Sequence, residues 1–215
     1  MYYEKLVSIY NSNDLQDLFP EISIDEFDQF IRSQVKKGNK FISPYKFALE
    51  QSITVNESVK FFIYFTGENQ IFDILYYFDC SRPGCINNRI YLDSNDDLDE
   101  PIICEECGKA YSYNSLKKYI KVLFKIKSEL NVPTDFKKIE KKNPNSTYDA
   151  LKELPPHLKF ESPSSPVYLD EGDEQGVPLE TVFEQNNDNK GKPISNIIEE
   201  FKKMVVEISR KNEKT

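Results

Sequence analysis

The sequence has very little of the side-chain chemistry on which common enzymes depend. Histidine occurs once, at His157, in a proline-rich stretch with no nucleophile motif beside it, and tryptophan is absent. No glycine-rich phosphate loop, nucleophile elbow or histidine–glutamate metalloprotease motif occurs. His157 is therefore expected to be a surface residue. We expect a protein that is not an enzyme and that has no small-molecule substrate.

Two further absences concern location and partners. No apolar run approaches the ~20 residues needed to cross a bilayer, and the N-terminal residues lack the pattern of a signal peptide. An excess of basic residues is also missing, since 28 Lys and Arg against 36 Asp and Glu give a net charge of -8. Bulk nucleic-acid binding requires lysines and arginines that neutralise phosphates. We expect a cytoplasmic protein with no membrane partner.

Aromatic residues are abundant by contrast. The chain contains 15 Phe and 13 Tyr, most of them before residue 125, which predicts a packed core in that part. Residues 1–70 have the pattern of short helices: Ser23 and Glu26 form a capping box ahead of an apolar stripe, and further helices are expected over 45–51 and 57–66.

From residue 71 onward, the spacing of apolar residues changes from that of a helix to that of a strand. Residues 72–79 are β-branched and aromatic, and 89–93 form a second predicted strand. Helices followed by a hairpin resemble a winged helix over about residues 20–93. The resemblance implies that the hairpin is the wing and that its tip holds the first cysteine pair. We assign 71–114 to β-hairpins that contain a zinc ribbon.

The four cysteines form two closely spaced pairs, Cys80 with Cys85 and Cys104 with Cys107. This spacing is typical of a structural zinc site with four thiolate ligands, and it resembles zinc ribbons in general. Four thiolates fill a tetrahedral shell and leave no position for water, so the Zn²⁺ is expected to be structural. Two disulfides, an iron–sulfur cluster and unligated cysteines remain alternatives.

Residues 115–142 are predicted to be a basic amphipathic helix. Between Cys107 and Lys142 ten lysines stand against three acidic residues. The residues expected to bind nucleic acid or an acidic partner are Lys117, Lys118, Lys121 and Lys125. The alternative is a solvated lysine face over a buried apolar face.

The C-terminal part is expected to be a linker followed by a helix. Residues 143–192 are rich in proline and acidic residues and predict a flexible acidic linker, and 193–212 predict an amphipathic helix. The helix must either fold back on the protein or dock on another protein, and we prefer docking or coiled-coil association. The predicted docking residues are Ile194, Ile197, Ile198, Phe201, Val205 and Ile208.

The resulting fold class is α+β: a helical winged-helix-like body, a four-cysteine zinc ribbon, a basic helix, a flexible linker and a C-terminal amphipathic helix. The composition, rich in Asn, Lys, Ile and Tyr, indicates an AT-rich genome, as in many bacteria and phages. We expect a non-catalytic adaptor or accessory subunit that binds protein partners in a larger assembly. The alternative is a nucleic-acid-binding transcriptional regulator.

Overall fold

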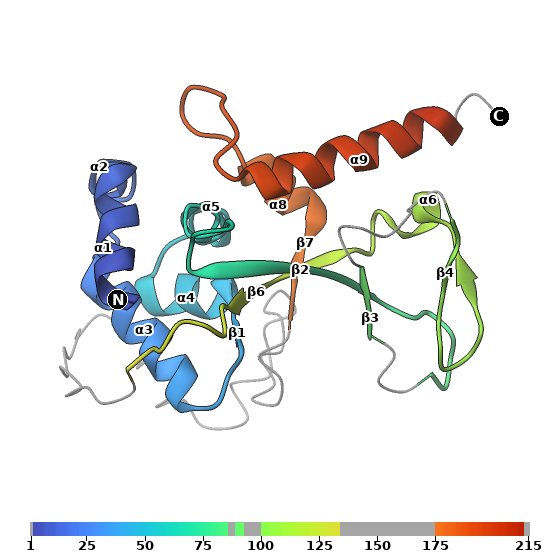
Figure 1. Cartoon of the computed structure of the whole chain (residues 1–215), viewed down its shortest axis with the longest axis horizontal. Helices are drawn as coiled ribbons and strands as arrows, with labels where there is room; N and C mark the ends of the chain where they lie inside the picture. Colours follow the sequence, from blue (N-terminus) through green and yellow to red (C-terminus); the bar gives the residue numbers. More distant parts are fainter. Residues whose placement is uncertain (1, 86–88, 93–99, 134–174, 213–215) are drawn as a thin grey trace, which may run out of the picture.

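The computed structural model combines helices with two antiparallel sheets and describes residues 2–85, 89–92, 100–133 and 175–212 (Figure 1). Its helices are α1 (Tyr2–Ser12), α2 (Leu15–Leu18), α3 (Ile24–Lys36), α4 (Pro44–Gln51), α5 (Val55–Ile63), α6 (Tyr113–Leu116), α8 (Leu179–Gln185) and α9 (Asn196–Asn212). Its strands are β1 (Phe41–Ile42), β2 (Phe72–Asp79), β3 (Arg89–Leu92), β4 (Ile102–Ile103), β5 (Ala110–Tyr111), β6 (Lys121–Ile126) and β7 (Val177–Pro178). The expected α+β class is confirmed.

The larger sheet has the strand order β1-β6-β2-β3, and β7 also pairs with β6. All of its pairings are antiparallel, with Tyr77 of β2 opposite Lys121 of β6 and Tyr91 of β3. The smaller sheet contains only β4 and β5 and lies at the far end of β2 from the N-terminal helices (Figure 1).

An aromatic core lies between the helices and one face of the larger sheet. Successive side chains of a strand point to opposite faces, so Phe72 and Tyr76 of β2 share a face with Phe124 of β6. The ring of Phe62 from α5 lies 5.4 Å from the rings of Phe72 and of Phe124. Phe201 of α9 stacks on Tyr76 with ring centroids 3.8 Å apart. Helices α5 and α9 therefore cover the same face.

Helices α3 and α5 begin at side-chain caps. The hydroxyl of Ser23 accepts a hydrogen bond from the backbone N–H of Asp25 at the start of α3. Helix α5 begins two residues earlier than expected, because Thr54 and Glu57 form a reciprocal capping box. The helices expected over 45–51 and 57–66 are confirmed, with the second displaced toward its N-terminus.

The predicted basic helix over 115–142 is wrong where the structure describes it. Only Tyr113–Leu116 is helical, and Lys121–Ile126 forms β6, the strand that pairs with β1, β2 and β7. A strand covered on both faces has a continuous apolar run, here Val122, Leu123 and Phe124. Such a run fits helical spacing equally well over a short stretch. Residues 134–142 lie outside the described part.

The linker predicted over 143–192 is also corrected at its C-terminal end. Residues 175–192 contain β7 and α8, and Val177, Leu179 and Val182 are buried. Strand β7 pairs with β6, and α8 packs against α5. These contacts with distant parts of the chain fix the structure of residues 175–192, whereas their local composition alone resembles a linker. The prediction for 143–174 lies outside the described residues.

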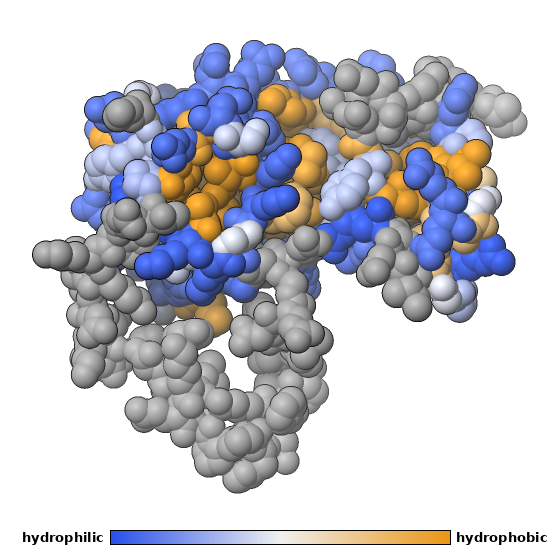
Figure 2. Space-filling model, turned by 60° about the horizontal axis from the view of Figure 1, so that its bottom comes forward, coloured by the Kyte–Doolittle hydropathy of each residue, from blue (hydrophilic) through white to orange (hydrophobic). Residues whose placement is uncertain are grey.

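The most exposed large apolar side chains of the described residues lie at the end of the molecule that holds β3, β4 and β5. Tyr119 is 65% exposed, Ile103 59% and Tyr91 49%. The space-filling view likewise shows hydrophobic residues on the surface at this end (Figure 2). Each of the three side chains belongs to or adjoins the segment that contains the cysteines.

Candidate metal centre

Two loops bring the four cysteines together. Cys80 directly follows β2 and Cys85 lies in the loop toward β3, whereas Cys104 and Cys107 lie in the turn between β4 and β5. Gly84 and Gly108 have φ values of 84° and 69°, a left-handed region that glycine enters without a Cβ clash. The backbone N–H of Gly108 donates to the carbonyl of Cys104 at 2.8 Å, which closes the second turn.

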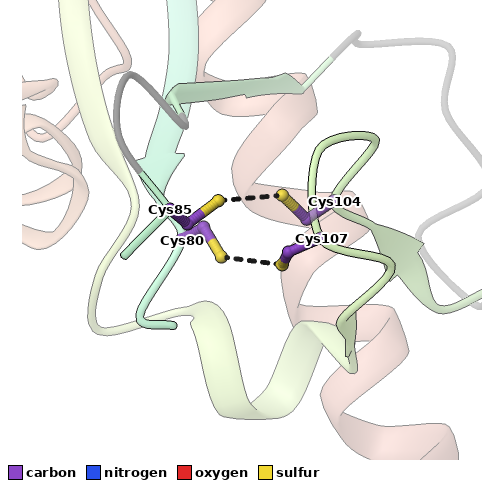
Figure 3. A group of neighbouring side chains, drawn as sticks. All are labelled: Cys80, Cys85, Cys104 and Cys107. Carbon is purple, nitrogen blue, oxygen red and sulfur yellow. Dashed lines mark hydrogen bonds between the residues drawn. The ribbon is translucent and has the colours of Figure 1, made fainter. Parts of the chain in front are cut away.

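The four sulfur atoms form a compact cluster (Figure 3). The Sγ atoms of Cys80 and Cys107 are 3.6 Å apart, those of Cys85 and Cys104 are 3.7 Å apart, and all four lie within 4.8 Å of one another. A tetrahedral ion with metal–sulfur bonds of about 2.3 Å has sulfur–sulfur edges of about 3.8 Å. The cluster therefore has the size required to hold one metal ion.

Tyr111 of β5 links the two cysteine loops. Its hydroxyl donates a hydrogen bond to the Sγ of Cys80 at 2.9 Å and accepts one from the backbone N–H of Ser81 at 2.9 Å. The ring packs edge-on against Phe78 of β2, with centroids 5.2 Å apart. The guanidinium of Arg82 also donates to the carbonyl of Cys107 at 2.8 Å. These contacts hold the two loops together through side chains as well as through the cysteines.

The cysteines have different electrostatic surroundings. The hydrogen bond from Tyr111 lowers the pKa of Cys80 to about 6, because it stabilises the thiolate. Burial, with a further contribution from the Glu106 carboxylate, raises the pKa of Cys85. The surroundings of Cys80 therefore favour its thiolate, whereas those of Cys85 favour its thiol.

The sequence pointed to the cysteines but not to Tyr111. The chain contains 13 tyrosines, and the position of Tyr111 four residues beyond Cys107 is no standard metal motif. The only available signal was alternation along β5. Opposite Tyr111 stands Ile102, and this pair faces the cysteines, whereas the next pair, Ile103 and Ala110, is exposed. The strand itself was too short to be predicted with its register.

The four candidate lysines do not form one basic surface. Lys117 and Lys118 are exposed beyond α6, whereas Lys121 and Lys125 lie on β6 and are partly buried. The ammonium of Lys121 lies 3.1 Å from the carboxylate of Asp79, and Lys125 stands opposite Asp73 in the sheet. The carboxylate on the neighbouring strand thus offsets the charge of Lys121. The Asp73 carboxylate lies 3.3 Å from the ammonium of Lys127, another residue of this segment. The nucleic-acid alternative therefore loses the continuous basic helix on which it depended.

The predicted docking residues of α9 contact the protein itself. Ile198 and Phe201 are 0% and 1% exposed, and Ile208 is also buried, so they cannot receive a partner in this conformation. Ile194, Ile197 and Val205 are partly buried. The preferred interpretation, docking on another protein, is wrong for the buried residues. The alternative, a helix folded back on the protein, describes α9.

The loop between α8 and α9 is fixed by two hydrogen bonds of a buried asparagine side chain. The side chain of Asn186 accepts from the backbone N–H of Ser195 at 2.8 Å and donates to its carbonyl at 3.1 Å. Both residues are buried. A fully paired buried amide fixes the direction in which the chain leaves α8.

Comparison with known proteins finds no matching family, no similar curated protein and no similar solved structure. Among the helices that the structure describes, none combines the length and apolar character needed to span a membrane.

Proposed function

We propose that Cys80, Cys85, Cys104 and Cys107 bind one structural Zn²⁺. The observation that supports this most directly is the cluster of four Sγ atoms within 4.8 Å of one another. Four thiolates complete a tetrahedral shell, so no coordination position is left for water or substrate. The ion then joins the two cysteine loops and stabilises their folded conformation.

Metal analysis tests the zinc proposal. Protein purified without added metal should contain one zinc per chain, and X-ray absorption should show four sulfur ligands at about 2.3 Å. The Cys104→Ser variant should lose the zinc. Iron in place of zinc, or a protein that contains no metal and two disulfides, would contradict the proposal.

We further propose that α3 to β6 form a winged-helix-type unit with the ribbon inserted in its wing. The strand order β1-β6-β2, with β1 between the first and second of three helices, supports this topology. In this arrangement the second wing strand is β6, and β3 with the β4–β5 hairpin is the insertion. The sequence had suggested β3 as the second wing strand.

The third helix of this unit, α5, is poorly placed to read DNA. Val59, Phe61 and Phe62 are buried in the core, and α8 packs against the helix. Its lysine, Lys60, donates to the side chain of Asn189 at 3.3 Å. A recognition helix instead needs a polar, open face for base edges. These contacts support protein binding over sequence-specific DNA binding.

On these grounds we propose that the protein is a non-catalytic adaptor or accessory subunit of a larger bacterial or phage assembly. Because α9 is folded back, the partner-binding surface is assigned to the ribbon end. Tyr91, Ile103 and Tyr119 are exposed there. Exposed aromatic and aliphatic side chains contribute strongly to protein interfaces.

Mutation of the ribbon surface tests the adaptor proposal. Ile103→Asp should abolish co-purification of a stoichiometric partner from the native cells, while zinc content and melting temperature stay unchanged. Leu49→Asp is the matched control, since Leu49 is also exposed but lies on α4 in the helical body. A partner retained by the Ile103 variant, or lost equally in both variants, would contradict the assignment of the surface.

A further inference from the structure

The four cysteines are not equivalent ligands. Cys80 is buried, and its Sγ accepts a hydrogen bond from the Tyr111 hydroxyl at 2.9 Å. Tyr111 is itself 7% exposed and is held by the Ser81 N–H and by the edge of Phe78. A buried, fixed donor stabilises negative charge on a thiolate and orients it toward the metal. Cys80 is thus held by a buried hydroxyl donor from outside the set of cysteines.

Cys85 has the opposite surroundings. It is partly exposed, and its Sγ lies 3.1 Å from Oε2 of Glu106. A shallow depression of about 410 Å³ opens beside it, lined by Arg82, Pro83, Gly84, Cys85, Glu106 and Cys107. Once Cys85 is a metal-bound thiolate, the neighbouring carboxylate repels it. Cys107 also borders the depression, but no carboxylate contact of this kind is described for its sulfur.

We propose that the metal centre has one fixed and one labile ligand: Tyr111 is a positioning residue that fixes Cys80, and Cys85 is the thiolate that leaves the metal first. This inference rests on the proposed zinc site. Electrophiles that enter the depression therefore react first at Cys85. With a maleimide, the Cys85 sulfur–zinc bond breaks as a sulfur–carbon bond forms, the carbon–carbon double bond opens, and the adjacent carbon takes a proton from water.

Alkylation of the zinc-loaded full chain tests the order of reaction. N-ethylmaleimide is added in small portions, zinc release is followed with a chromophoric chelator, and modified cysteines are located by mass spectrometry. We expect Cys85 to be modified first and Cys80 last. Glu106→Gln should slow the reaction of Cys85, because the repelling charge is gone, whereas Glu105→Gln should leave the order and rate unchanged.

Tyr111→Phe separates the hydrogen bond from the packing of the ring. Loss of an outer-shell partner typically lowers metal affinity by about 10- to 100-fold, so we expect a decrease of this size and faster alkylation of Cys80. Tyr113→Phe is the matched control, because the buried Tyr113 hydroxyl has no hydrogen-bond partner in the described structure. Zinc affinity and alkylation order in that variant should match the parent protein.

The outcomes distinguish this inference from the zinc proposal. If the protein binds no zinc, both are overturned. If zinc is bound but the four cysteines react at equal rates, or if Tyr111→Phe behaves like Tyr113→Phe, only the inequality of the ligands is overturned. Zinc binding with Cys85 reacting first and a selective effect of Tyr111→Phe supports both.

Discussion

Buried tyrosine hydroxyls differ in whether they have a partner. The hydroxyl of Tyr10 lies 2.8 Å from the carbonyl oxygen of Ile22, to which it donates. The hydroxyl of Tyr76 is buried under Phe201 and has no hydrogen-bond partner in the described structure. Burial raises the pKa of Tyr76 above the ordinary value for tyrosine, because a phenolate in this position would lose its hydration. A buried polar group without a partner costs stability, and a paired one contributes it.

Removal of these two hydroxyls should therefore have opposite consequences. Tyr10→Phe is expected to lower the free energy of unfolding by about 1 kcal/mol, because it leaves the Ile22 carbonyl without its donor. Tyr76→Phe should be neutral or stabilising, since the ring stack on Phe201 is kept. Urea denaturation of both variants measures the difference. A larger loss in Tyr76→Phe would show that its hydroxyl has a partner.

The conformation of β6 and the position of α9 depend on the elements that pack beside them. Strand β6 has neighbours on both edges, because β2 lies on one side and β1 with β7 on the other. Helix α9 has one apolar face, which it places on the larger sheet through Phe201 and Tyr76. The same amphipathic pattern would also suit a groove on a partner protein. Because the protein has its own apolar sheet face, α9 packs on that face instead.

The packing of α9 leads to a prediction. Phe201→Ala should lower the free energy of unfolding by about 3–5 kcal/mol, the usual cost of truncating a buried phenylalanine. Val206→Ala is the control on the same helix, because Val206 is 40% exposed, and surface substitutions change stability by about 0.5 kcal/mol or less. Equal stability of the two variants would indicate that α9 does not pack on the sheet.

At the scale of the whole molecule, the N-terminal helices and the β4–β5 hairpin lie at opposite ends of the larger sheet (Figure 1). Phe27, Phe47 and Phe61 pack with ring centroids 4.9 to 5.9 Å apart between α3, α4 and α5. At the other end, the ring of Tyr111 joins the β4–β5 hairpin to Phe78 of the larger sheet, and the four cysteines join its turn to the loop after β2. The two ends should accordingly differ in their dependence on metal.

Loss of the proposed zinc should unfold the β4–β5 hairpin with its cysteine turn and leave the helical body intact. In Cys104→Ser, hydrogen exchange is expected to accelerate over residues 102–116 while α3 and α5 stay protected, because local unfolding follows the elements with the fewest buried contacts. Addition of a chelator to the parent protein should have the same effect. Global loss of protection in the variant would show that the core requires the ribbon.

Local patterns predicted the helices over 45–51 and 57–66, the α+β class and the proximity of the four cysteines, because capping and cysteine spacing act over a few residues. They failed at β6 and at 175–192. The run Val122, Leu123, Phe124 fits a strand or a helix. The proline and acidic residues before α8 are typical of a linker, so their composition gave no sign of strand β7.

The sequence by itself determined which residues can cap helices, bury apolar surface and ligate a metal, since these properties belong to side-chain chemistry and short spacing. Only the tertiary structure decided that β6 is a central strand, that α9 folds back, and that Tyr111 reaches Cys80. Each of these depends on contacts between residues far apart in the chain: β6 needs β1, β2 and β7 beside it, α9 needs the face around Tyr76, and Tyr111 needs the turn after β2. The free energy of such contacts exceeds the small local preferences that a sequence pattern reports.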